Sequence, residues 1–203
     1  MEYSAITKYK GLIFDLDGTL INSMSFHAAA WRQVANEHGF DIDEADIYKM
    51  GGSSSYDIAR HYKNKGLPVG DVESYVQRKI AIYKENLDKI VTFPKIVQVL
   101  KDAKERGVKV AVGTGSRTVN ATRVLTMKGL IDYVDVLVTA DDVTRHKPNP
   151  DTFLLAAQKL GLDVKECCVF EDGALGVKAA VNGAFDCIEV KDNQMINYFE
   201  IER

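Results

Sequence analysis

Short apolar runs alternate with longer amphipathic stretches along the chain. The apolar runs cover residues 12–14, 108–112, 134–138, 167–170 and 185–190. Continuous apolar runs of this length are typical of parallel strands that are covered on both faces. Between them, residues 95–106, 151–160 and 173–181 place their apolar side chains on one helical face. The pattern therefore predicts an α/β fold built on a parallel sheet.

One interval departs from this alternation. More than 90 residues separate Asp15 from Val108, and none of them gives a convincing strand pattern. Crossovers in α/β folds are usually far shorter. The interval instead predicts four helices, at about 26–38, 43–49, 54–65 and 72–87. We therefore expect a helical insert over residues 24–91, and a core domain formed by residues 1–23 and 92–203.

Composition limits the class of protein. The chain has 203 residues, of which 46% are hydrophobic and 27% charged, as in soluble globular proteins. A net charge of -3 without a basic patch argues against a nucleic-acid partner, and no apolar run approaches the ~20 residues of a membrane span. The three cysteines are an odd number, and Cys167 and Cys168 stand beside apolar residues, which favours free thiols in a reducing compartment. We expect a cytoplasmic protein.

Two carboxylates stand where the first strand ends. Asp15 and Asp17 fall on the same side of an extended strand, and Gly18 then permits a tight turn. Open α/β sheets bind ligands at the carboxyl ends of their strands. For this pair alone, the alternative is a polar strand end in which one aspartate caps a helix.

Three more expected strands are followed by reactive groups. Thr114 and Gly115 offer a hydroxyl and free backbone N–H groups, which suit an anion or a helix cap. Lys147 stands in a proline-rich segment that could equally be a surface loop, and the pair Glu171 and Asp172 could equally cap a helix. Capping alone does not readily explain four strands that each deliver such groups to one edge.

The ordered set of these residues resembles the four motifs of the haloacid dehalogenase superfamily. The set is Asp15-Leu16-Asp17-Gly18-Thr19-Leu20, then Thr114, Lys147 and Glu171-Asp172. The resemblance extends over essentially the entire sequence, and the insert stands where that superfamily has a small helical cap. Residues 110–116, 146–148, 150–155 and 169–172 are similar to the sugar-phosphatase and β-phosphoglucomutase-like branch. The resemblance implies a Rossmann-like, doubly wound sheet of five or six parallel strands in the order 3-2-1-4-5.

The resemblance implies a role for each carboxylate. Asp15 would be the nucleophile that forms an aspartyl-phosphate, and Asp17 the acid that protonates the leaving sugar oxygen and then the base that activates water. Mg²⁺ would be held by Asp15, the backbone carbonyl oxygen of Asp17 and Asp172, with Glu171 acting through a bound water.

The resemblance also implies the groups that hold the substrate. Thr114, the N–H of Gly115 and Lys147 would bind the transferring phosphoryl oxygens, with Lys147 also taking part in catalysis. His27 and Ser54, which belong to the insert, would contact the substrate. His27 could instead be an ordinary surface or core histidine.

The resemblance implies a Mg²⁺-dependent phosphatase for a small sugar phosphate of the fructose 1-phosphate type. A β-phosphoglucomutase-type mutase is the main alternative, but the Lys and Arg that handle its second phosphate align with Gly51 and Ser55 here, and Lys49 is two residues out of register. A haloalkanoate dehalogenase needs no metal and has no use for Asp17. A non-catalytic phosphate-binding regulator is the alternative from another class. The oligomeric state is not predicted.

Overall fold

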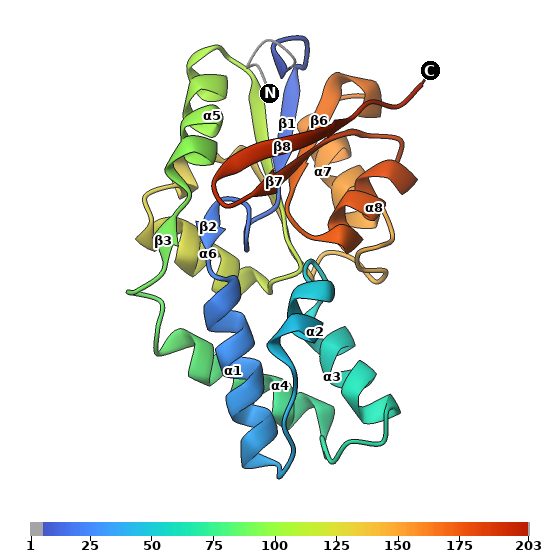
Figure 1. Cartoon of the computed structure of the whole chain (residues 1–203). Helices are drawn as coiled ribbons and strands as arrows, with labels where there is room; N and C mark the ends of the chain where they lie inside the picture. The colour runs from blue at the N-terminus through green and yellow to red at the C-terminus, as the bar shows by residue number, and fades with distance from the viewer. Residues whose placement is uncertain (1–5, 203) are drawn as a thin grey trace.

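A computed structural model describes residues 6–202 of the protein. Figure 1 shows a sheet flanked by helices, with a separate group of helices, α1–α4, at one end of it. Within residues 6–202, no helix combines the length and the apolar character that a membrane crossing requires.

The sheet has six strands in the order β5-β4-β1-β6-β7-β8. They are β1 (Gly11–Phe14), β4 (Lys109–Gly113), β5 (Val136–Val138), β6 (Cys167–Glu171), β7 (Asp186–Lys191) and β8 (Gln194–Phe199). The first five in that order are parallel, and they are the five strands expected from the apolar runs, in the order 3-2-1-4-5. The prediction allowed five or six parallel strands; the sheet has five, and its sixth strand is antiparallel. Strand β8 pairs antiparallel with β7 through a hairpin in which Asp192 and Asn193 adopt the left-handed conformation.

Helices cover both faces of the sheet, as a doubly wound fold requires. Helices α5 (Pro94–Glu105) and α6 (Thr118–Met127) cover one face, and α7 (Asp151–Leu160) and α8 (Ala174–Asn182) cover the other. Leu12 and Phe14 of β1 belong to the first hydrophobic cluster, whereas Ile13 belongs to the second. Short 3-10 helices lie at Ile131–Tyr133 and Val164–Glu166. All three cysteines are buried free thiols, as predicted.

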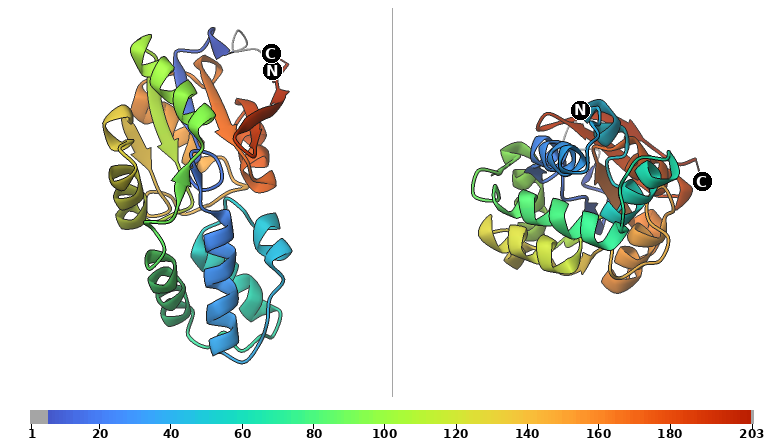
Figure 2. Two further views of the ribbon diagram at one scale, coloured as in Figure 1. Left: turned by 60° about the vertical axis from the view of Figure 1, so that its left-hand side comes forward. Right: turned by 90° about the horizontal axis from the view of Figure 1, so that it is seen from below.

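The interval after the first strand forms four helices, as predicted. They are α1 (Met24–Glu37), α2 (Glu44–Lys49), α3 (Ser55–Asn64) and α4 (Val72–Lys84). Trp31 and Tyr75 pack between α1 and α4. The side chains of Asp43, Ser54 and Asp71 cap the N-termini of α2, α3 and α4. Figure 2 shows that these helices stand apart from the sheet, beyond one of its ends.

Two very short strands join this helical group to the core. Strand β2 (Ile21–Asn22) pairs antiparallel with β3 (Val91–Thr92), at the two ends of the interval. We expected no strand between Asp15 and Val108, and two residues per strand are too few to leave a pattern in the sequence. The pairing brings both ends of the helical group to one place beside the sheet.

Candidate active site

The reactive groups predicted from separate strand ends converge at one edge of the sheet. Asp15 follows β1, Thr114 follows β4 and Glu171 is the last residue of β6. Strands β4 and β6 are the two neighbours of β1 in the sheet. The backbone N–H of Asp15 donates to Phe170 at 2.9 Å and that of Thr114 to Val138 at 2.9 Å, so each residue is held where its strand ends.

Lys147 forms ion pairs with two of these carboxylates, Asp15 and Glu171. Its Nζ atom lies 2.6 Å from Asp15 Oδ1 and 2.6 Å from Glu171 Oε1, and it also donates to the Gly113 carbonyl at 3.2 Å. The lysine side chain is 1% exposed. Burial alone would lower the pKa of Lys147, but the charges of Asp15 and Glu171 raise it above its ordinary value. The site thus keeps a buried cation beside the candidate nucleophile.

The acidic groups outnumber this cation. Carboxylate oxygens of Asp15, Glu171 and Asp172 lie within 4.8 Å of one another. Burial and the charge of Glu171 raise the pKa of Asp172 to about 8, and burial likewise raises the pKa of Asp15. Two buried carboxylates and the partly buried Asp172, facing one lysine, leave a shortage of positive charge that a hard divalent cation would correct. The donor set therefore fits Mg²⁺.

Gly18 allows the loop after β1 to lie close to this acidic group. Its φ is +96°, and a Cβ atom there would stand 2.1 Å from Asp172 Oδ2. Thr19 next to it donates to Asp172 Oδ1 at 2.8 Å. The Asp17 carboxylate is not part of the acidic group, and the predicted role of its backbone carbonyl oxygen as a metal ligand stays a prediction.

Asp17 instead faces a set of hydrogen-bond donors. Oδ1 accepts from Ser23 at 2.7 Å and pairs with His27 Nε2 at 2.9 Å, while Oδ2 accepts from Ser116 at 2.7 Å. Tyr83 OH lies 3.5 Å from Oδ1. Burial would raise the pKa of Asp17, but His27 and the two serine hydroxyls lower it below its usual range. Asp17 is therefore ionised at neutral pH.

A second buried lysine completes this set, and sequence reasoning missed it. Lys79 of α4 is 3% exposed, and its Nζ lies 2.7 Å from His27 Nδ1. It stands over the rings of Trp31 and Tyr83, at 5.1 and 5.3 Å. Burial lowers the pKa of Lys79 to about 8, and burial together with the Lys79 charge lowers the pKa of His27.

The lowered pKa values of Asp17 and His27 are linked. The pKa of Asp17 is lowest when His27 is charged, whereas Lys79 opposes that charge. A charged Lys79 donates to Nδ1 only when His27 is neutral, and Nε2–H then donates to Asp17. We take this arrangement, Lys79 cationic, His27 neutral and Asp17 anionic, as the one that the geometry satisfies.

The loop of residues 51–53 lies directly on the site. A Cβ atom at Gly115 would stand 2.7 Å from the Gly52 carbonyl oxygen and 2.9 Å from that of Ser53, and one at Gly173 would stand 2.9 Å from the Gly51 oxygen. These glycines allow close contact between the helical group and the strand ends. The structure is therefore in a closed state.

A cavity of about 50 Å³ remains beneath this loop. Its floor carries Asp15, Asp17, Thr114, Gly115 and Ser116, and His27 and Lys79 line it from the helical side. That side also carries the apolar side chains of Met24, Trp31, Ile47, Met50 and Ile58. The volume holds a few water molecules. A sugar phosphate is larger, so we expect the loop to move when one enters.

All of the predicted site residues except Ser54 lie at the cavity or directly beside it. The structure brings Asp15, Asp17, Thr114, Gly115 and His27 to the cavity wall, with Lys147, Glu171 and Asp172 directly beside them. It does not bring Ser54 there. The Ser54 hydroxyl donates to Asp57 at 2.7 Å and accepts from its N–H at 3.2 Å, so it caps α3, and Ser53 and Ser55 line the cavity instead.

Comparisons with known proteins agree with this geometry. A family model described as haloacid dehalogenase-like hydrolase matches residues 9–183. The protein is 37% identical to fructose-1-phosphate phosphatase YqaB of Escherichia coli, over 91% of its own length and 97% of that relative, and 32% identical to hexitol phosphatase A of the same organism, over 89% and 82%. The crystal structure of β-phosphoglucomutase from Clostridium difficile superposes with a TM-score of 0.80 at 25% identity, over 89% of the present protein and 84% of the other.

Proposed function

The protein belongs to the haloacid dehalogenase-like hydrolases and is a phosphoric monoester hydrolase, and from this premise we propose that it hydrolyses a small sugar phosphate with Mg²⁺ through a phosphorylated Asp15. The observation that carries the proposal is the convergence of Asp15, Asp17 and Lys147 at one edge of the sheet, beneath a helical cover. Nucleophile, acid–base group and cation are thereby within reach of one phosphoryl group.

In the first step, an Asp15 carboxylate oxygen forms a bond to phosphorus as the bond from phosphorus to the sugar oxygen breaks. Lys147, the Thr114 hydroxyl and the Gly115 N–H offset the negative charge on the phosphoryl oxygens. Asp17 gives its proton to the sugar oxygen as that oxygen leaves. Asp17 takes up this proton from solvent when the substrate phosphate arrives, because a neighbouring negative charge raises the pKa of a carboxylate.

In the second step, the Asp17 carboxylate takes a proton from a water molecule as the water oxygen attacks phosphorus. The bond from phosphorus to Asp15 breaks, which frees inorganic phosphate and restores the nucleophile. Hydrogen bonds from His27, Ser23 and Ser116 hold Asp17 in place for both proton transfers.

Asp15, Asp172 and, through water, Glu171 would hold Mg²⁺, which fits the closeness of their oxygens and the shortage of positive charge around them. When bound, the ion supplies positive charge that neutralises the phosphoryl oxygens.

We propose that residues 24–91 act as a cap that selects the substrate. Its residues form the wall opposite the strand ends, so the part of the substrate beyond the phosphoryl group lies against them. Two relatives with identities of 37% and 32% are named as a fructose-1-phosphate phosphatase and a hexitol phosphatase, and both names denote small polyhydroxylated substrates. This supports a sugar or polyol phosphate as the substrate.

The lining of the cavity favours the phosphatase over the mutase. A mutase must bind a second phosphate, and positions 51 and 55 offer Gly51 and Ser55 to the cavity instead of cations. Lys49 is 74% exposed and pairs with Asp46 at 3.0 Å, on the outside of α2. Lys79, the cap lysine that lines the cavity, already donates to His27.

A panel of phosphorylated sugars, polyols and nucleotides, assayed for phosphate release with Mg²⁺, tests the proposal. We expect release from sugar or polyol monophosphates, and none from any compound with the Asp15→Asn variant. A coupled assay with glucose-6-phosphate dehydrogenase follows conversion of β-glucose 1-phosphate in the presence of a bisphosphate primer. Activity confined to nucleotides, or primed isomerisation faster than phosphate release, would overturn the assignment.

A further inference from the structure

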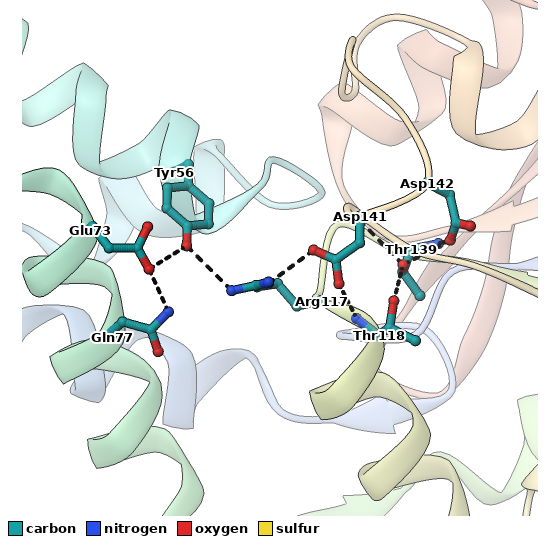
Figure 3. A network of polar contacts seen from close by, with 8 residues as sticks. All are labelled: Tyr56, Glu73, Gln77, Arg117, Thr118, Thr139, Asp141 and Asp142. Carbon is teal, nitrogen blue, oxygen red and sulfur yellow. Dashed lines mark hydrogen bonds and ion pairs between the residues drawn. The ribbon is translucent and has the colours of Figure 1, made fainter.

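A polar network crosses from the cap to the core at one side of the cavity. Figure 3 shows this network, in which Arg117 stands between an aspartate of the core and a tyrosine of the cap. Arg117 directly precedes α6 and directly follows Ser116, which lines the cavity and donates to Asp17. The network therefore begins one residue from Ser116, the hydroxyl that donates to the proposed acid–base group Asp17.

The core half of the network is rigidly built. Arg117 Nε donates to Asp141 Oδ1 at 2.9 Å, and the first N–H of α6, at Thr118, donates to Asp141 Oδ2 at 2.9 Å. Thr118 is also linked at 2.7 Å to the hydroxyl of Thr139, which donates to Asp142 at 2.8 Å. All of these bonds lie within the core, so none of them depends on a contact with the cap.

The cap half is equally complete in itself. Tyr56 of α3 donates to Glu73 Oε1 of α4 at 3.0 Å, and Gln77 donates to the same oxygen at 2.8 Å. The phenol therefore already has an acceptor within the cap. Because α3 begins two residues after the loop of residues 51–53, a contact that holds Tyr56 in place also restricts the position of that loop.

A long contact joins the two halves. Arg117 Nη1 donates to Tyr56 OH at 3.5 Å, so the phenol lies between the guanidinium and the Glu73 carboxylate. The Arg117 side chain is 43% exposed. If the cap moved away, Arg117 would keep Asp141 and Tyr56 would keep Glu73, so breaking the contact leaves neither group without a partner. Such a contact is suited to repeated opening and closing.

We propose that Arg117 and Tyr56 form a clasp that stabilises the closed position of the cap and so positions the loop of residues 51–53 over the substrate. The cavity of about 50 Å³ is smaller than a sugar phosphate, so we expect the loop to move away and return in each turnover. Partly exposed charged contacts alter an equilibrium by about 1.4-fold to about 5-fold. The clasp thus favours the closed state without trapping the product.

Hydrogen exchange of the loop tests the clasp without reference to any particular substrate. Peptides covering residues 51–55 are followed in the presence of Mg²⁺ and beryllofluoride, for the wild type, Tyr56→Phe, Arg117→Gln and the double variant. Each single variant should exchange faster, by about 1.4-fold to about 5-fold. Because both act on one contact, the double variant should exchange no faster than the faster single variant.

Arg32→Gln is the matched control. Arg32 is an exposed arginine of the cap, and its ion pairs, with Asp41 at 3.1 Å and Glu44 at 3.9 Å, lie within the cap. In the Arg32→Gln variant, the peptides covering residues 51–55 should exchange as in the wild type. Melting temperatures should show that all variants are folded. Raising NaCl to about 0.5 M should speed loop exchange in the wild type and leave Arg117→Gln unchanged. Wild-type exchange in both single variants, additive effects in the double variant, or an equal effect of Arg32→Gln would overturn the proposal.

Discussion

Replacing Lys79 with methionine should make the protein more stable and less active at the same time. Burial lowers the pKa of Lys79 from 10.5 to about 8, so the folded protein holds the ammonium group less favourably than water does. That difference corresponds to about 3 kcal/mol at pH 7. Contacts with the Trp31 and Tyr83 rings offset about 1 kcal/mol or somewhat more. Methionine has a similar length and no charge, so the net gain should be about 1–2 kcal/mol.

The gain should depend on pH in a defined direction. The folded pKa of Lys79 lies below the unfolded value, so the unfavourable contribution is complete below about pH 8 and disappears as the pH rises towards 10.5. The stability difference between Lys79→Met and the wild type should therefore shrink over that window. Urea unfolding at about pH 7 and about pH 10 measures both values.

Activity should change in the opposite sense. Without the Lys79 ammonium, His27 loses the donor at Nδ1 that fixes its Nε2–H towards Asp17. We expect kcat to fall by about 10-fold to 100-fold, less than the ~10²–10⁴ expected for loss of an acid–base group itself. Lys84→Met, on the same helix and partly exposed, is the control and should leave both properties unchanged. A Lys79→Met variant that is less stable at pH 7 and fully active would refute this reasoning.

Three further predictions concern the core site. In single-turnover assays, Asp17→Ala should slow the first half-reaction by about 10²-fold to 10⁴-fold on a sugar phosphate, and by much less on p-nitrophenyl phosphate, because a good leaving group needs no proton. Equal losses on the two substrates would exclude Asp17 as the acid. Gly115→Ala places a methyl 2.7 Å from the Gly52 oxygen, so KM should rise and the loop of residues 51–53 should exchange faster; unchanged exchange would contradict the closed contact. EDTA should abolish phosphate release and added Mg²⁺ restore it, with a higher melting temperature, whereas full activity in EDTA would exclude the metal.

The parallel strands and the groups at their ends could be predicted from the sequence because both follow from local patterns and from the topology. Asp15, Thr114 and Glu171 each follow an apolar run, and parallel strands bring such positions to one edge. Ser54 was assigned to the substrate although Ser54 and Asp57 have the spacing of a helix-capping pair, which is the role the structure gives to Ser54.

Lys79 shows why the remainder could not be predicted directly. It lies 52 positions from His27, and only the packing of α4 against α1 brings the two together. Its neighbours do carry a signal, since Val76 and Tyr83, three positions before and four after, put Lys79 on the buried face of its helix. The Arg117–Tyr56 contact left no pattern of this kind, because it depends on how the closed cap lies against the core.

The central claim is that Asp15 carries the phosphoryl group during turnover. The most direct measurement is mass spectrometry of the enzyme quenched in acid during a single turnover with Mg²⁺ and the best sugar phosphate of the panel. We expect one phosphoryl group on the peptide that contains Asp15, and neither label nor turnover for a folded Asp15→Asn variant. Label on another residue, or turnover by Asp15→Asn, would contradict the claim.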